Sequence, residues 1–344
     1  MRVWIHPKVF ETERQAKLGV LCEHGLEARH CLMITDSEHQ AYKAWREQQS
    51  GLILREWDKA LKNSSKRHRL GASTWEIEIV EGESSDWKPY PPKLSLTDAV
   101  DLLNKKFQIV LEGDAEDEDF LRQMATENQR NELTRWEKEL KGMEFYPAGG
   151  ISSATKKARE ESATSKENGE RVSPGLRFRR WYLFDSDALE PGKESSQSQK
   201  LREICEGPDK LNPSLPFHQL KRRMIENYLP KAALDRWTRT VKGPERSKRE
   251  QKFEAFLELG EPRRFFYNMK TGFPITDDGE VVVEATYDDL DSRTINLLKK
   301  PGFGGGIGKL FKISKGVISE KDLEKDGGWQ EINPKVKELL AMIR

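Results

Sequence analysis

The stretch FQIVLEGDAEDEDFLRQM, residues 107–124, joins a short apolar run to a dense acidic segment. Six carboxylates fall within the eight positions 112–119. Like charges repel one another and burial strips them of water, so such a cluster beside a buried strand needs either solvent or a positive charge nearby. Gly113 permits a tight turn between the apolar run and the helical pattern that follows. The stretch therefore predicts a strand, a sharp turn and a helix, with an acidic edge between them.

Strand-like and helical patterns alternate through the middle of the chain. Apolar runs at 106–113, 143–150 and 177–188 are separated by a helical pattern at 118–141 and a polar segment at 152–170. Strands joined by helices indicate βαβ crossovers and a mostly parallel sheet. We therefore expect an α/β fold whose central sheet is flanked by helices, with functional residues at the carboxyl ends of its strands.

Composition divides the chain into three parts. Residues 1–100 combine short apolar runs with one long amphipathic helical pattern, which predicts an N-terminal α/β accessory domain. The Pro- and Ser-rich stretch at 83–100 has the composition of a linker into the next domain. Residues 101–235 hold the alternating pattern. Residues 236–344 are expected to form a C-terminal α+β region that either packs on the central sheet or docks a partner.

Charge and cysteine content narrow the class of protein. The 59 Lys and Arg residues nearly balance the 58 Asp and Glu residues while 34 % of all residues are charged, which favours local electrostatic features over one global field. No run is apolar over the length of a membrane span, and residues 1–10 lack the pattern of a signal peptide. Three cysteines cannot form a disulfide framework, which fits a reducing compartment. We expect a cytoplasmic protein that does not enter a membrane.

Acidic side chains directly follow two of the predicted strands. Glu112 ends the first, and Asp185 and Asp187 end the run RFRRWYLFDSDA. Side chains two positions apart in a strand point to the same face, so Asp185 and Asp187 are expected to project together. Several carboxylates that converge from neighbouring strand ends, with oxygen ligands only, favour Mg²⁺ or Mn²⁺ over zinc. A divalent ion would supply the positive charge that the acidic edge needs.

Three segments, VLEGDAEDEDFL, LFDSDA and KRRMIENYLP, resemble in their order and spacing the TOPRIM domain. The resemblance covers roughly residues 105–232. It is closest to nucleases of the overcoming-lysogenization-defect (OLD) family and to related TOPRIM effectors of bacterial phage-defence systems. Glu112 with Gly113 matches the first motif, the Asp-x-Asp pair matches the second, and Glu226 lies in the third, IENY.

The fourth acidic element of the OLD pattern has two candidates in this chain. It lies a few positions after the first Glu, where Glu116 is the natural match. Phe120 and Leu121 come one residue later than in the usual pattern, so Asp117 is the alternative. The resemblance leaves both open.

The resemblance implies a metal-dependent endonuclease that hydrolyses phosphodiester bonds with two Mg²⁺ or Mn²⁺ ions. It implies five carboxylate ligands that are also catalytic residues: Glu112, Glu116, Asp185, Asp187 and Glu226. OLD-type nucleases use a basic residue downstream of the acids, for which Lys270 is the candidate. DNA and RNA both stay open as substrates, the latter as the target of a toxin. A TOPRIM-like module that binds nucleic acid or a partner without cutting is the alternative function.

Basic clusters could contact the phosphate backbone of a nucleic acid. They lie at 66–69 (KRHR), 177–180 (RFRR), 221–223 (KRR) and 245–252 (ERSKREQK), and a solvated surface is the plainer interpretation of each one alone. The KRR cluster, Lys221, Arg222 and Arg223, is the strongest candidate because it precedes the IENY segment at the same edge as the predicted metal site.

Two further patterns carry less weight. GFGGGIGKLF, residues 302–311, lacks the first Gly and the Ser or Thr of a Walker A motif and is predicted to be a flexible glycine turn. Cys22, His24, His30 and Cys31 lack the spacing of a zinc knuckle. OLD-like nucleases usually carry an ATPase in the same chain, and no such motif is evident, so the resemblance favours control by a separate ATPase subunit.

Overall fold

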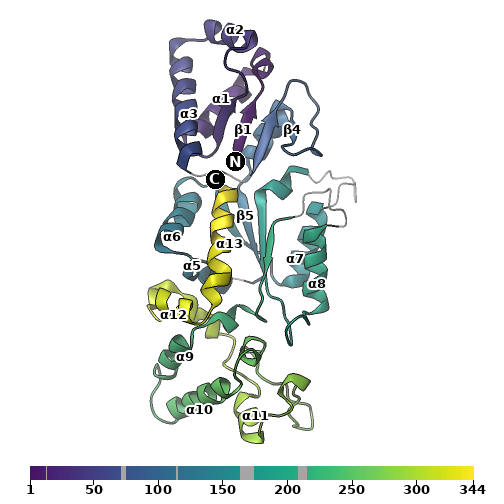
Figure 1. Ribbon diagram of the computed structural model, residues 1–344, viewed down its shortest axis with the longest axis vertical. Helices are drawn as coiled ribbons and strands as arrows, with labels where there is room; N and C mark the ends of the chain where they lie inside the picture. Colours follow the sequence, from purple (N-terminus) through teal and green to yellow (C-terminus); the bar gives the residue numbers. More distant parts are fainter. Residues whose placement is uncertain (13, 71–74, 114, 163–173, 208–214) are drawn as a thin grey trace.

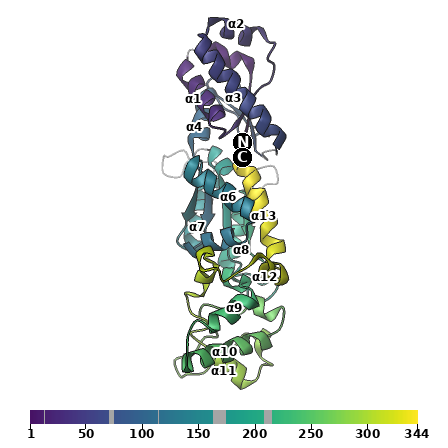
Figure 2. The same cartoon turned by 90° about the vertical axis from the view of Figure 1, so that its left-hand side faces the viewer.

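The chain folds into an elongated molecule with three parts in a row (Figures 1 and 2). Its structure is a computed structural model that describes residues 1–344 except 13, 71–74, 114, 163–173 and 208–214. An N-terminal unit lies at one end, a central sheet in the middle, and a group of short helices at the other end. Within this described part, no helix combines the length and the apolar character needed to cross a membrane.

The N-terminal unit contains a four-stranded sheet, all parallel, in the order β2-β1-β3-β4. In β1 and β3 every second residue is buried because one face of the sheet packs on helices. The strands are β1 (Arg2–Ile5), β2 (Cys31–Ile34), β3 (Glu76–Ile79) and β4 (Lys93–Leu94). The helices are α1 (Gln15–Leu26), α2 (Gln40–Gln48), α3 (Gly51–Leu70) and α4 (Leu96–Asn104).

The boundary of this unit differs from the one expected at residue 100. Strand β4 lies inside the stretch that reads as a linker and pairs with β3. Helix α4 spans the expected boundary and buries Ala99, Val100 and Leu103 in the N-terminal core. The unit therefore continues to the end of α4, because the apolar face of that helix finds its partners before the chain enters the central sheet.

The central unit contains a second four-stranded parallel sheet, in the order β6-β5-β7-β8. The two parallel sheets flanked by helices confirm the expected α/β class. The strands are β5 (Phe107–Leu111), β6 (Met143–Pro147), β7 (Arg180–Phe184) and β8 (Phe217–Gln219). The helices are α5 (Ala115–Gln123), α6 (Glu127–Thr134), α7 (Ile151–Ser162) and α8 (Ser196–Glu206).

Helices cover both faces of the central sheet. Helices α7 and α8 pack on one face, where Val110 of β5 and Tyr182 of β7 share a core with Leu201 of α8. Helices α5, α6 and α13 cover the other face, where Ile109 and Phe120 lie in the largest apolar core. Since both faces are covered, the acidic residues can meet solvent only at the ends of the strands.

The C-terminal region shares its core with the central sheet. Its helices are α9 (Lys231–Thr238), α10 (Pro244–Glu258), α11 (Ser292–Leu298), α12 (Glu320–Lys325) and α13 (Gly328–Ile343). Helix α13, yellow in Figure 1, runs back beside the central sheet and buries Ile332, Val336 and Leu339 in the same core as β5 and α5. Of the two alternatives expected for this region, the structure shows packing on the central sheet.

Short single-turn helices complete the described chain. They are η1 (Pro7–Glu11), η2 (Arg135–Glu139), η3 (Pro174–Arg179), η4 (Ile225–Tyr228), η5 (Arg263–Phe265), η6 (Ala285–Tyr287), η7 (Ile307–Phe311) and η8 (Ile313–Lys315). Two of them reach the candidate site, η4 with the IENY segment and η7 with the glycine-rich segment.

Candidate active site

Glu112 and Asp185 meet at the carboxyl ends of the neighbouring strands β5 and β7. The backbone N–H of Glu112 donates to the carbonyl of Leu183 at 3.2 Å, which continues the ladder between the two strands. The backbone N–H of Asp185 in turn donates to Oε2 of Glu112 at 3.0 Å. The parallel pairing of β5 with β7 therefore fixes these two acids against each other, as functional residues at strand ends require.

Asp187 reaches the same edge, but not by the route expected from strand alternation. Strand β7 ends at Phe184, and Asp187 adopts a left-handed backbone with φ +48°. Its N–H donates to the carbonyl of Arg223 at 2.9 Å, which fixes this turn against the segment after β8. The expectation that Asp185 and Asp187 project together as strand neighbours is wrong, because the strand has already ended.

The pKa values of Glu112, Asp185 and Asp187 are raised. Burial raises the pKa of the Glu112 carboxyl to about 7, and the charges of Asp187 and Asp117 add to the effect, while the Asp185 N–H and Lys270 oppose it. Burial followed by the charge of Glu112 raises the pKa of Asp185 well above its usual range. Burial also raises the pKa of Asp187, against the opposing charges of Arg223 and Lys270. Burial is thus the main reason that the charged forms of these three acids are disfavoured, and like charges add to the effect at Glu112 and Asp185.

Both candidates in the first turn of α5, Glu116 and Asp117, lie at the site. Oδ2 of Asp117 accepts from the N–H of Gly113 at 2.7 Å, and the Asp117 charge raises the pKa of Asp185 and Glu226. Glu116 lies on the side of η7: a Cβ built on Gly308 would meet Oε2 of Glu116 at 2.5 Å and Oε1 of Glu226 at 2.9 Å. The structure thus brings both candidates to the cluster, and the choice between them stays open.

Glu226 is the most deeply buried acid of the cluster. It lies in η4 with no exposed surface, and in the described part of the chain neither carboxylate oxygen accepts a hydrogen bond. Burial raises its pKa. The closest positive charge is Lys270, whose Nζ forms an ion pair with Oε1 at 3.2 Å. A fully buried carboxylate that is paired with one lysine is costly, so this position is suited to a further positive group that binds oxygen.

Lys270 brings positive charge into the cluster from the C-terminal region. Burial alone would lower its pKa, but the charges of Glu226 and Asp185 outweigh that effect and raise it. The ammonium group therefore stays charged and partly balances the acids. The sequence alone does not identify Lys270 securely, because no recognisable motif connects it to Glu226.

The basic cluster 221–223 divides between structural and exposed roles. The Arg222 guanidinium is buried, donates to the carbonyls of Asn227 (2.7 Å) and Asp326, and stacks 3.9 Å from the ring centroid of Phe265. The assignment of Arg222 to phosphate binding is therefore wrong, because its donors are used inside the fold. Lys221 is exposed, and its assignment stays a prediction.

Arg223 lies on the Asp187 side of the cluster. Its Nη1 donates to the carbonyl of Phe266 at 3.1 Å and lies 3.6 Å from a carboxylate oxygen of Glu284. Its charge lowers the pKa of Asp187 against the effect of burial. Arg223 thus has partners within the fold, and its assignment to nucleic-acid binding stays a prediction.

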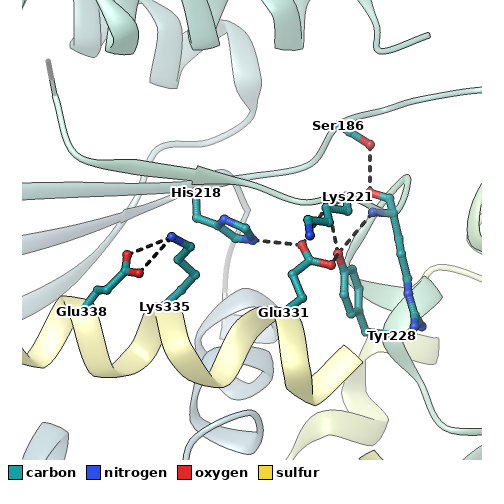
Figure 3. Close-up of polar contacts among 8 residues, drawn as sticks. Ser186, His218, Lys221, Tyr228, Glu331, Lys335 and Glu338 are labelled. Carbon is teal, nitrogen blue, oxygen red and sulfur yellow. Dashed lines mark hydrogen bonds and ion pairs between the residues drawn. The ribbon is translucent and has the colours of Figure 1, made fainter. Parts of the chain in front are cut away.

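Helix α13 holds the segment that carries Glu226 through one carboxylate (Figure 3). Oε1 of Glu331 accepts from Nε2 of His218 at 2.9 Å and from the N–H of Lys221 at 3.0 Å, and its Oε2 accepts from the Tyr228 hydroxyl at 2.8 Å. Burial would raise the pKa of Glu331, but these hydrogen bonds outweigh it and lower the pKa. The sequence gives no signal for this contact, since the partners lie far apart in the chain.

The glycine-rich segment packs against the site, contrary to the flexible turn expected from its composition. Ile307, Leu310 and Phe311 of η7 are buried in the core that contains α5. Gly308 lies so close to Glu116 and Glu226 that a Cβ there would collide with both carboxylates unless they moved. The glycine at this position serves close packing against two acids.

The donor set suits a divalent ion, although the acids are not arranged as a ready-made site. Over the described residues, which exclude Asp114, no three His, Cys, Asp or Glu side chains form a group that could hold a metal ion. The carboxylates, including buried Glu226 with its ion pair to Lys270, are nevertheless the hard oxygen donors that Mg²⁺ and Mn²⁺ prefer.

Comparison with known proteins assigns no family to this arrangement. No family model, no curated protein and no solved structure matches the chain.

Proposed function

We propose that the chain is a divalent-metal-dependent nuclease of the TOPRIM type, with the acidic edge of the central sheet as its active site. The observation that carries the proposal is the convergence of Glu112 and Asp185 on one hydrogen bond at adjacent strand ends, with Glu226 and Lys270 beside them. The raised pKa values support it, because a bound cation would stabilise the charged forms of carboxylates that burial and neighbouring acids disfavour.

The residues would divide the work by position. Glu112 and Asp185 would hold an ion from the ends of β5 and β7, and Glu226 with Glu116 or Asp117 would hold a second from the α5 side. Two bound divalent ions would supply an activated water and stabilise the leaving oxygen of a phosphodiester. Lys270 would keep its proton and attract the scissile phosphate to the acids, which would otherwise repel it.

A cleavage assay tests this proposal. Plasmid DNA and total RNA are incubated in parallel with Mg²⁺ or Mn²⁺ and wild type, Glu112→Gln or Asp185→Asn. Glu118→Gln is the matched control, because it removes a carboxylate from the same acidic run but from a side chain that pairs with Arg122 at 2.8 Å. We expect cleavage by wild type and the control and none by the two site variants. The nucleic acid that disappears identifies the substrate.

The alternative is a module that binds nucleic acid or a partner without cutting. The observation that favours it is Lys270, which already supplies a positive charge to Glu226. This alternative predicts that wild type cleaves neither DNA nor RNA with either ion, while Glu112→Gln retains the binding affinity of wild type.

We further propose that the nuclease is a cytoplasmic effector of a bacterial phage-defence system under the control of an ATPase subunit in trans. The support is the resemblance of its three motifs to such effectors. Co-expression with the products of the neighbouring genes tests this idea. Cleavage that appears or is suppressed only together with an ATPase among them supports it, and cleavage that none of them affects contradicts it.

A further inference from the structure

A small cationic cavity lies at the junction of the N-terminal and central units. Several of its lining residues directly precede β5, β6 and β7, so it lies at the opposite end of the central sheet from the acids. Its volume is about 10 Å³, which admits roughly one water-sized atom. The described lining includes no carboxylate and six basic side chains: Arg29, His30, Lys105, Lys106, Lys141 and Arg179.

Arg179 is buried at this cavity without a negative partner. Only 2 % of its surface is exposed. Its Nε, at 2.9 Å, and its Nη2 donate to the carbonyl of Lys105, while Nη1 is buried and has no hydrogen-bond partner among the described residues. Burial lowers its pKa to about 10, so the guanidinium is still charged at neutral pH. A buried unpaired charge is strongly unfavourable and is rarely kept without a counter-ion.

The next residue along the chain, Arg180, is also a buried arginine, but its charge is balanced by an acid within the fold. Its guanidinium forms an ion pair with Glu161. Glu161 also accepts a hydrogen bond from the hydroxyl of Tyr182. Arg180 thus has its counter-charge within the fold. Arg179 has none among the described residues, so its counter-charge must come from elsewhere.

The nearby histidines, His24 and His30, do not provide a counter-charge for Arg179. His30 lines the cavity, and its Nδ1 is buried without a partner. Burial lowers the pKa of His24 to about 4 and that of His30 well below its usual range, and the charge of Arg179 acts in the same direction. Both rings are neutral at pH 7, so they add polar atoms and no negative charge.

The rim extends the positive charge to the surface. Arg29 pairs with Glu27 and Lys106 with Glu144, so these two are already compensated. Lys105 and Lys141 form no ion pair with a described residue. Surface lysines alone would be an ordinary solvated surface, but half-buried Lys105 and exposed Lys141 line the same cavity as a buried guanidinium that lacks a negative partner among the described residues.

We propose that this junction binds a phosphate-type oxyanion, with one oxygen in the cavity against Nη1 of Arg179 and the remaining oxygens at the mouth between Lys105 and Lys141. The cavity is large enough for a single oxygen, and guanidinium and ammonium groups together are the usual protein ligands of phosphate. The anion is either a free phosphate compound or a phosphate of a nucleic-acid backbone. The inference does not rest on the nuclease function, because the site lies at the other end of the sheet.

Anion binding can be measured with inorganic phosphate by its effect on the melting temperature of the full chain. Excess EDTA in the buffer prevents recruitment of phosphate through metal at the acidic edge, and chloride at equal ionic strength serves as the reference. The test variant is Lys105→Gln with Lys141→Gln, which leaves the buried arginine in place. The matched control is Lys242→Gln with Lys248→Gln, which removes two exposed charges around the start of α10.

We expect phosphate to stabilise wild type and control with a saturable concentration dependence beyond that of chloride, and to bind the test variant about tenfold more weakly. Arg179→Lys is expected to weaken phosphate binding as well. If Arg179→Lys fails to fold, the double variant Lys105→Gln with Lys141→Gln still tests the proposal. If a short oligonucleotide competes with inorganic phosphate for this site, the natural ligand is a phosphate of a nucleic-acid backbone. If the oligonucleotide does not compete, the natural ligand is a free phosphate compound. Equal effects of phosphate and chloride, or equal binding by the test variant and the control, would show an ordered water or an adventitious ion only and overturn the proposal.

Discussion

Replacing Gly308 by alanine perturbs two acids of the site without removing either of them. A methyl group at this position would lie 2.5 Å from Oε2 of Glu116 and 2.9 Å from Oε1 of Glu226, whereas ordinary contacts begin at 3.4 Å. Glu116 is partly exposed and can rotate toward solvent, whereas Glu226 is fully buried and cannot. Overpacking of this kind costs about 1–3 kcal/mol, and we expect a value near the lower end, about 1–2 kcal/mol, because one of the two side chains can yield.

The catalytic effect is expected to exceed the loss of stability. Displacement of Glu226 by a fraction of an ångström would misplace an oxygen that we assign to metal binding, and such errors reduce rates by up to about a hundredfold. Urea denaturation gives the free energy of unfolding, and the cleavage assay with Mn²⁺ gives the rate. Gly306→Ala is the matched control, since its nearest neighbour would lie 3.9 Å from the new methyl group. If Gly308→Ala keeps the rate and stability of this control, η7 does not press against the acids and the geometry proposed here is wrong.

Three further predictions concern charge and hydrogen bonding. Lys270→Met removes a positive charge that lowers the pKa of Glu112, so this pKa should rise further. The acidic limb of the pH–rate profile of cleavage should then move to higher pH, and an unchanged profile would contradict the role of Lys270. In metal-free protein the raised pKa of Glu112 means that the folded state binds the proton of this carboxyl more tightly than the unfolded state, so the contribution of Glu112 to stability is lost as the pH rises from about 4.5 to 7. In EDTA, Glu112→Gln should therefore gain stability relative to wild type through this pH range. A stability difference that does not change with pH would refute the raised pKa. Glu331→Gln places an amide among the three donors to Glu331 that Figure 3 shows, and should lower the free energy of unfolding in urea by about 1–3 kcal/mol. Glu338→Gln, in an exposed ion pair with Lys335 on the same helix, should lower it by less than about 0.5 kcal/mol. Equal losses for the two variants would contradict the role of the Glu331 hydrogen bonds.

The parts of the site that come from local sequence could be predicted. The apolar run before Glu112, the turn at Gly113 and the helix after it follow from residues that are neighbours in the chain. The alternation of strands and helices likewise predicts parallel pairing, which brings Asp185 to the end of the strand beside β5. These features depend on periodicity and turn chemistry, which a single sequence shows.

The remaining features depend on contacts between distant segments. Arg222 is indistinguishable from an exposed phosphate ligand until the carbonyls that surround it are known. Glu331 reaches the site only because α13 returns along the central sheet, and Gly308 because η7 packs on α5. The left-handed backbone of Asp187 could not be expected from strand alternation, since the strand ends three residues earlier.

The most direct test of the central claim is the rate of phosphodiester cleavage as a function of Mn²⁺ concentration for wild type, Glu112→Gln and Glu118→Gln. We expect wild type and Glu118→Gln to show the same saturable dependence on Mn²⁺ and Glu112→Gln to show no cleavage at any concentration. Cleavage by Glu112→Gln at the wild-type rate, or no Mn²⁺-dependent cleavage by wild type either alone or co-expressed with the products of neighbouring genes, would contradict the claim that the acidic edge of the central sheet is a metal-dependent active site.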